Sequence, residues 1–87
     1  MPSEARRVVE LAKEDLARRL EISISEISVI SVEAVDWSDT SLGCPEPGMA
    51  YAQVITPGYL IVLGAAGQTY EYHTDEHSSV VLCRGDG

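Results

Sequence analysis

The residues of this sequence that are best suited to chemistry are two cysteines, Cys44 and Cys83, and two histidines, His73 and His77. A thiol beside an imidazole can act as a nucleophile with its base, so Cys44 with His73 is one candidate for a small thiol enzyme. Pro45 follows Cys44 and removes the next backbone N–H, which is a usual oxyanion donor. The acidic surroundings also disfavour a thiolate. We therefore assign no catalytic residue, and the domain is more readily interpreted as a non-enzyme.

The five residues from His73 to His77 contain two imidazoles and two carboxylates. His73, Asp75 and His77 together form an acceptable ligand set for a transition metal. Polar turns collect such residues for solvation alone, and the sequence has no CxxC motif of the kind that marks structural zinc sites. A metal site at these three residues is the alternative function, beside the thiol enzyme, and no cofactor is expected.

Cys44 and Cys83 could instead form a disulfide. Closing a loop of about 40 residues would stabilise the domain by about 4 kcal/mol in the chain-entropy model, which is a large share of the stability of a small domain. The other possibility is two buried free thiols in a reducing compartment. We favour the bridge slightly, and it requires Cα atoms within about 7 Å.

The elements that must position these residues belong to one domain, residues 1–87, because 87 residues are too few for two. Apolar residues recur three and four positions apart up to Leu20, which predicts an amphipathic helix over about residues 4–21. Within it, Val8, Leu16 and Leu20 should belong to the core.

Beyond the helix, the hydrophobic period changes to that of strands, which should form a sheet over about residues 27–83. Residues 27–37 alternate imperfectly, which indicates either a bulge or burial of both faces for part of the length. Residues 59–65 are the most apolar stretch and should be central, with residues 59–63 in the core. Thr56-Pro57-Gly58 suits a type II turn. The strands are expected at residues 27–37, 49–55, 59–65, 68–73 and 80–83, with a loose tail at residues 84–87.

This order predicts an α+β fold, with one N-terminal helix packed on a four- to five-stranded antiparallel sheet, because the connections are too short for parallel crossovers. Three segments, written here in one-letter code, carry a resemblance: WSDTSLGCPEPG at residues 37–48, YAQVITPGY at 51–59 and YEYHTD at 70–75. They resemble a group of small uncharacterised bacterial domains with no known function, several of which lie in exported proteins or lipoproteins. The element order also resembles cystatin-like and PepSY-like arrangements.

The charge of the chain limits its partners. The formal net charge is −8, and only Arg84 is basic from Ile22 onward. Nucleic acid and anionic membranes require a basic surface, so neither is expected as a partner, and no segment is long and apolar enough for membrane insertion. A basic protein is the kind of partner that this charge would favour. The chain as given suits the cytoplasm, and an exported or periplasmic location fits if it is part of a longer protein.

The loop over residues 38–49 is the most unusual segment, because two prolines restrict its backbone. A restricted loop loses little entropy on binding. We therefore interpret the domain as a non-catalytic interaction or accessory domain, of which a protease inhibitor is a narrower form. Its contact residues would be Trp37, Leu42, Pro45, Glu46 and Pro47.

Overall fold

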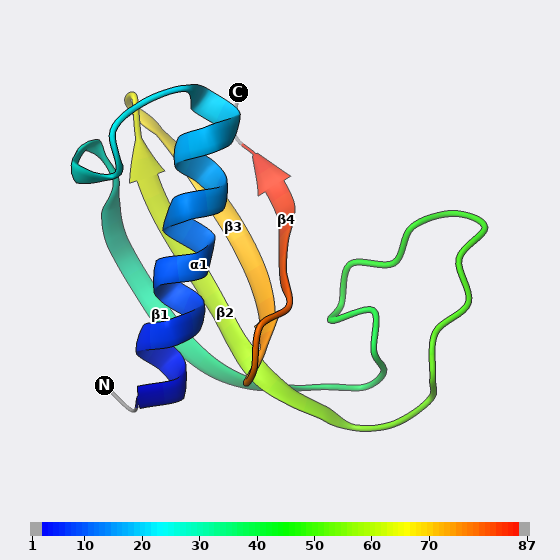
Figure 1. Ribbon diagram of the computed structural model, residues 1–87. Coiled ribbons are helices and arrows are strands. Elements are labelled where there is room, and N and C mark those ends of the chain that lie inside the picture. The colour runs from blue at the N-terminus through cyan, green and yellow to red at the C-terminus, as the bar shows by residue number, and fades with distance from the viewer. Residues whose placement is uncertain (1–2, 86–87) are drawn as a thin grey trace.

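The helix α1 (Ser3–Leu20) lies across one face of a four-stranded antiparallel sheet (Figure 1). The computed structural model describes residues 3–85. The strands β1 (Ser28–Trp37), β2 (Thr56–Ala65), β3 (Gln68–Asp75) and β4 (Val80–Gly85) neighbour one another in chain order, and a short 3₁₀ helix, η1 (Ile24–Glu26), precedes β1. The predicted α+β fold is therefore confirmed. No helix in the described part of the chain is long and apolar enough to span a membrane.

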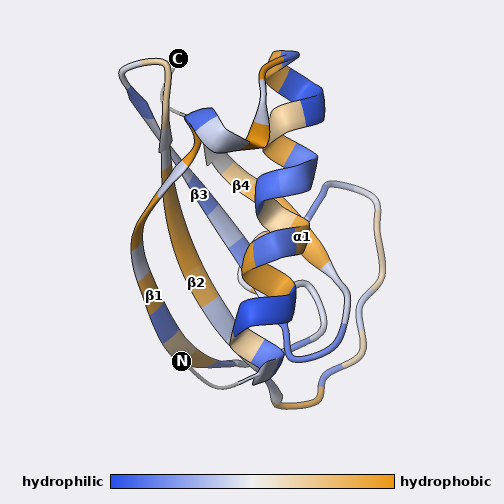
Figure 2. Ribbon diagram, turned by 60° about the vertical axis from the view of Figure 1, so that its left-hand side comes forward, coloured by the Kyte–Doolittle hydropathy of each residue, from blue (hydrophilic) through white to orange (hydrophobic). Residues whose placement is uncertain are grey.

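The hydrophobic core lies between α1 and the sheet. The spacing that predicted the helix brings its apolar residues onto one face, where Val8 and Leu16 are fully buried and Leu20 is partly buried. β2 is the most uniformly apolar strand and lies inside the sheet, as predicted (Figure 2). Because side chains alternate along a strand, only half of those in β2 face the helix: Tyr59, Ile61, Leu63 and Ala65.

Three local predictions are confirmed by the register of the strands. β1 carries an irregularity between Val29 and Ser31, where the bulge was expected. β3 begins at Gln68 and β4 at Val80, as predicted. The tail was placed too early, because β4 continues through Gly85 and pairs that residue with Tyr70. Residues 86–87 lie outside the described part.

The strand predicted over residues 49–55 is wrong, because these residues belong to a loop that spans residues 38–55. Both edges of β2 are already paired, with β1 and with β3, so residues 49–55 cannot add a strand there. Ala52 accepts a hydrogen bond from the amide of Thr40 and donates one to its hydroxyl. Two such bonds at one residue do not continue into a ladder.

The turn predicted at Thr56-Pro57-Gly58 is also wrong, since all three residues lie in β2. Pairing of β2 with β3 begins at Gly58, so Pro57 has a neighbouring strand on one side only and its missing N–H disrupts no ladder there. A Cβ on Gly58 would lie 1.8 Å from the carbonyl oxygen of Thr74. Glycine is therefore needed here for a close approach of two strands.

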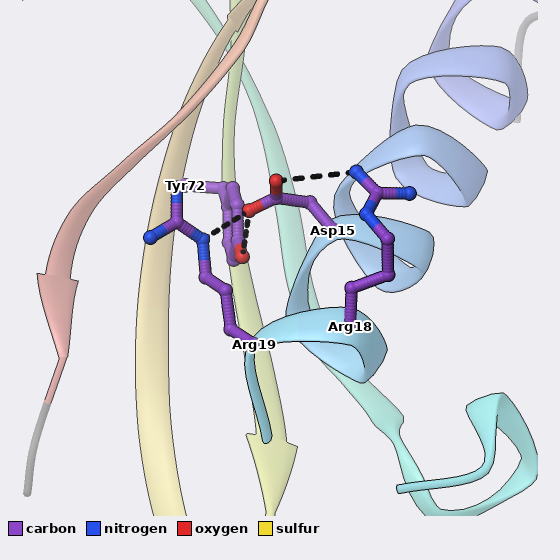
Figure 3. A network of polar contacts seen from close by, with 4 residues as sticks. All are labelled: Asp15, Arg18, Arg19 and Tyr72. Atoms are coloured by element: carbon purple, nitrogen blue, oxygen red, sulfur yellow. Dashed lines mark hydrogen bonds and ion pairs between the residues drawn. The ribbon is translucent and has the colours of Figure 1, made fainter. Parts of the chain in front are cut away.

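One polar network fixes the helix on the sheet (Figure 3). The buried Tyr72 of β3 donates its hydroxyl hydrogen to Oδ2 of Asp15 at 2.7 Å. The same carboxylate accepts a hydrogen bond from Nε of Arg19 at 2.6 Å and lies 3.5 Å from a terminal nitrogen of Arg18. Asp15 thus joins the C-terminal part of α1 to the middle of β3.

Two pKa values reflect this network. Burial acts to raise the pKa of Asp15, but hydrogen bonds from Arg19 and Tyr72, with the charges of Arg19 and Arg18, hold it below its usual value. The pKa of Tyr72 is raised by burial and then by its hydrogen bond to Asp15. The network therefore favours an ionised Asp15 and a protonated Tyr72.

Replacing Tyr72 by Phe should lower the free energy of unfolding by about 1–3 kcal/mol, because it removes a hydrogen bond to a charged carboxylate. Urea unfolding at about pH 7 measures this loss. Tyr70→Phe is the matched control, since Tyr70 is a half-buried tyrosine of the same strand and the same face. It should change stability by less than about 0.5 kcal/mol.

The same experiment has a pH dependence. A carboxyl whose folded pKa is depressed contributes stability above its unfolded pKa and loses it as the pH falls through the folded pKa. Wild-type protein should therefore lose the contribution of Asp15 as the pH falls below the ordinary aspartate pKa of about 4, and Tyr72→Phe should lose less. An equal acid loss in both proteins would contradict the role given to this hydrogen bond.

Candidate functional site

The loop of residues 38–55 leaves the sheet at Trp37 and extends beyond β4, on the side away from β1 (Figure 1). Its first part folds back onto the sheet face opposite α1. Tyr72 points toward the helix, so the next residue, His73, points toward the loop. We call the contact between loop and sheet the anchor, and it consists of Trp37, Leu42, His73 and the bonded pair Cys44–Cys83.

Two aromatic rings form the centre of the anchor. The rings of Trp37 and His73 are stacked, with centroids 4.4 Å apart and an angle of 16° between their planes. The indole N–H of Trp37 donates to the carbonyl oxygen of Thr74 at 2.9 Å. A Cβ on Gly58 would overlap this same carbonyl group. Because Gly58 has no side chain, the indole of Trp37 can reach the carbonyl oxygen. Trp37 thereby joins the end of β1 to β3 across β2.

Both nitrogens of the His73 ring contact an acceptor. Nδ1 lies 2.6 Å from the carbonyl oxygen of Leu42, and Nε2 lies 2.7 Å from Oε2 of Glu71. A carbonyl oxygen can only accept, so Nδ1 is the donor toward Leu42, while Nε2 faces the carboxyl group of Glu71. His73 is buried and thus holds the loop backbone through Nδ1 and an acidic side chain through Nε2.

The loop reaches His73 through a tight turn. Asp39 accepts hydrogen bonds from the amide and the hydroxyl of Ser41, and these bonds hold the pKa of Asp39 below its usual value. Leu42 and Gly43 follow with φ angles of 59° and 71°. This left-handed step buries the Leu42 side chain, which is 3% exposed, and brings Gly43 against the Trp37 ring.

The disulfide completes the anchor. Cys44 and Cys83 are bonded, and their Cα atoms lie 5.8 Å apart, within the predicted distance. The bridge spans 39 residues and ties the loop to β4. Both sulfurs are in the bond, so neither cysteine offers a free thiol for the nucleophile considered above.

The structure does not bring His73, Asp75 and His77 together as a ligand set. One oxygen of Asp75 accepts the backbone N–H groups of His77, Ser78 and Ser79, which closes the turn before β4. Burial acts to raise the pKa of Asp75, but these hydrogen bonds, with a smaller effect of His77, hold it below its usual value. His77 is exposed, on the other side of that turn from the buried His73.

A different group of potential metal ligands is present. Among the described residues, atoms of Glu71, His73 and Cys83 lie within 4.8 Å of one another. The sequence interpretation missed Glu71, although its place two residues before His73 on a strand puts both side chains on one face. The third member of the group, Cys83 on β4, could be placed beside them only from the strand pairing.

The predicted contact residues divide into two sets. Trp37 and Leu42 are buried, so they support the loop and are not free to meet a partner. A buried Leu42 should contribute to stability, since truncating a buried leucine typically costs about 2–5 kcal/mol. Pro45, Glu46 and Pro47 are exposed, as a contact surface requires. Further apolar side chains are exposed beside them: Met49 at 60%, Val54 at 53% and Ile55 at 64%.

Comparison with known proteins assigns the chain to a family. A family model described as a domain of unknown function (DUF8738) matches residues 9–83. The chain belongs to the DUF8738 family. Searches of curated proteins and of solved structures give no match. The DUF8738 match begins inside α1 and ends at Cys83, so it includes every residue of the anchor.

The packing of the DUF8738 anchor can be tested at two glycines of the loop. Gly43 and Gly48 both have positive φ angles, but a Cβ on Gly43 would lie 2.8 Å from the Trp37 ring, and a Cβ on Gly48 would meet nothing within 4 Å. Gly48→Ala should cost about 1–2 kcal/mol for the backbone alone. Gly43→Ala should cost about 1–3 kcal/mol more, because it also displaces the indole.

Thermal and urea unfolding of the two variants measure this difference, and the fluorescence of the single tryptophan reports the displacement of the ring. Equal losses of stability, with unchanged fluorescence, would show that the loop does not press on Trp37.

Proposed function

We propose that this domain is a non-catalytic protein-binding module whose contact surface is the outer part of the loop, residues 45–55, called here the contact segment. One observation carries the proposal: the two most exposed large apolar side chains of the described residues, Ile55 at 64% and Met49 at 60%, lie on a loop whose base is fixed to the sheet. Val54 on the same loop is also more than half exposed. Exposed apolar surface on a small domain can mark an interaction site.

The ends of the contact segment are held in place. Cys44, just before it, is bonded to β4, and Thr56, just after it, begins β2. Inside the segment, the amide of Glu46 donates to the hydroxyl of Tyr51 at 3.0 Å, and the amide of Met49 donates to the carbonyl of Glu46. A loop that is already ordered loses less conformational entropy on binding, which supports a role in recognition.

The charge distribution favours a particular partner chemistry. Residues 47–70 contain no charged side chain, although the formal net charge of the chain is −8. The contact segment is thus an uncharged apolar surface on an acidic domain, with Glu46 at its beginning. A protein with an apolar groove and basic residues around it would complement both features.

The test uses two variants with matched exposure. The double variant Met49→Ser/Ile55→Ser removes apolar contacts from the segment, and Ile30→Ser removes one from the outer face of the sheet, where Ile30 is 56% exposed. All proteins should unfold at nearly the same temperature, because exposed substitutions change stability by about 0.5 kcal/mol or less. Wild type and Ile30→Ser should capture the same partner from an extract of the source cells.

The double variant should lose that partner by about tenfold or more, since a well-packed interface side chain contributes more than about 1 kcal/mol. Raising the salt concentration should weaken capture by wild type if basic residues surround the groove. A partner that binds all three proteins equally would place the interface elsewhere and contradict the proposal.

A further inference from the structure

The potential metal ligands around His73 play no part in the proposed protein binding. We propose that reduction of the Cys44–Cys83 disulfide converts the anchor into a four-ligand zinc site. Its ligands are Cys44, Cys83, His73 and Glu71. Disulfide and zinc are then alternative links between the loop and β4, one for oxidising and one for reducing conditions.

The distances suit three of the four ligands, and the fourth, Cys44, is brought to them by its bond to Cys83. Atoms of Glu71, His73 and Cys83 lie within 4.8 Å of one another, and the sulfur of Cys44 is bonded to that of Cys83. Tetrahedral zinc, with bonds of about 2.0–2.3 Å, holds its ligand atoms about 3.3–3.8 Å apart. Nε2 of His73 and Oε2 of Glu71 are 2.7 Å apart, so they need to separate only slightly. The sulfurs, once released from their bond, need to move apart by side-chain rotation.

The ligand types are those that zinc takes. Two thiolates, one imidazole nitrogen and one carboxylate oxygen complete a closed tetrahedral set. His73 is already oriented for this role, because Nδ1 contacts the carbonyl of Leu42 at 2.6 Å and leaves Nε2 facing Glu71. A metal-binding histidine commonly donates from its other nitrogen to such a carbonyl, which fixes the ring and the ligating nitrogen.

The site is also accessible. The side chain of His73 is 7% exposed and that of Glu71 is 30% exposed, so an ion can approach from the side of the carboxylate. One basic residue is near in the sheet, because Arg84 follows Cys83 and pairs with Glu71. Two thiolates and one carboxylate carry more negative charge than Arg84 carries positive charge, so the site still attracts a dication.

The redox step is balanced by a dithiol. The dithiol gives two electrons and two protons to the Cys44–Cys83 bond and is itself oxidised to a disulfide, leaving two thiols on the protein. Zinc then binds, and the two thiol protons and any proton on Nε2 of His73 pass to solvent. Because all ligands come from the loop base, β3 and β4, the bound ion keeps the anchor closed without the covalent bridge.

The experiment uses the whole chain and Co²⁺ as a visible stand-in for Zn²⁺. Protein reduced with a phosphine, and then freed of the phosphine without air, should bind one equivalent of Co²⁺ with tetrahedral d–d bands and thiolate charge-transfer absorption. Zn²⁺ should displace the Co²⁺ and raise the melting temperature of the reduced protein. Oxidised protein should show neither the spectrum nor the rise.

Variants distinguish the proposed ligands from chance binding. Glu71→Gln should keep the fold and weaken metal binding by about tenfold or more, since even groups behind the ligands are worth about 10–100-fold. His73→Ala should abolish the tetrahedral spectrum. His77→Ala is the matched control, because His77 is the other histidine and is exposed, and it should bind like wild type.

Several results would overturn the proposal. For the wild type, these are a reduced protein that binds no Co²⁺, an octahedral Co²⁺ spectrum, or equal Co²⁺ binding by the oxidised protein. For the variants, they are an unchanged metal affinity in Glu71→Gln, or a loss of affinity in His77→Ala as large as that in Glu71→Gln. Far-UV circular dichroism of each reduced variant identifies loss of the fold, and Glu71→Gln decides the outcome where His73→Ala is unfolded.

Discussion

Tyr72 and His73 are adjacent in β3, and the alternation of side chains along a strand sends them to opposite faces of the sheet. On one face, the hydroxyl of Tyr72 donates to Asp15 and fixes α1. On the other face, His73 stacks on Trp37 and contacts the carbonyl of Leu42, which fixes the loop. The two layers on either side of the sheet therefore depend on one dipeptide. Any change in the pairing of β3 with β2 would move both contacts together.

The two faces differ in how they are stabilised. The helix face has a continuous apolar core, to which α1 and β2 contribute most of the buried side chains. The loop face has few apolar residues, and Leu42 and Trp37 are the large ones that are buried there among the described residues. A loop of 18 residues with so little apolar burial is costly to order, because each fixed residue loses about 1–2 kcal/mol of conformational entropy. The stack, the hydrogen bonds to His73 and the disulfide supply what the hydrophobic effect does not.

The sequence predicted those parts of the fold that follow from local periodicity. Three- and four-residue spacing located the helix, and strand-forming composition, apolar runs and alternation between turn residues located β1, β2, β3 and β4, because these patterns depend on residues that are close in the chain. The strand predicted at residues 49–55 failed because β-forming residues need a neighbouring strand, and β1 and β3 already occupy both sides of β2. The sequence Thr56-Pro57-Gly58 is typical of a turn, yet these residues lie in a strand. Gly58 is needed there because the backbone of Thr74, 16 residues later, approaches it closely. Of the site, Cys44 with Cys83 was predicted from the need of a small domain for a link. The contacts of His73 with Leu42 and of Cys83 with Glu71 could not be predicted, because they depend on the tertiary placement of the loop and of β4.

The loop changes character at Cys44. Before it, Ser41 and Leu42 are buried, and Leu42 belongs to the anchor; after it, Pro45, Glu46 and Pro47 are exposed. The disulfide is placed at this boundary, so it transmits the rigidity of the sheet to the contact segment without taking up any of its exposed side chains. If the bond is reduced and nothing replaces it, the anchor keeps the stack and the hydrogen bonds, but the segment gains freedom at its first residue and loses more entropy when it binds. A zinc ion held by the same cysteines would restore the constraint at the same point. Under the two proposals, binding by the segment and metal binding by the anchor would be coupled through one junction, with the redox state of Cys44 and Cys83 deciding which link is made.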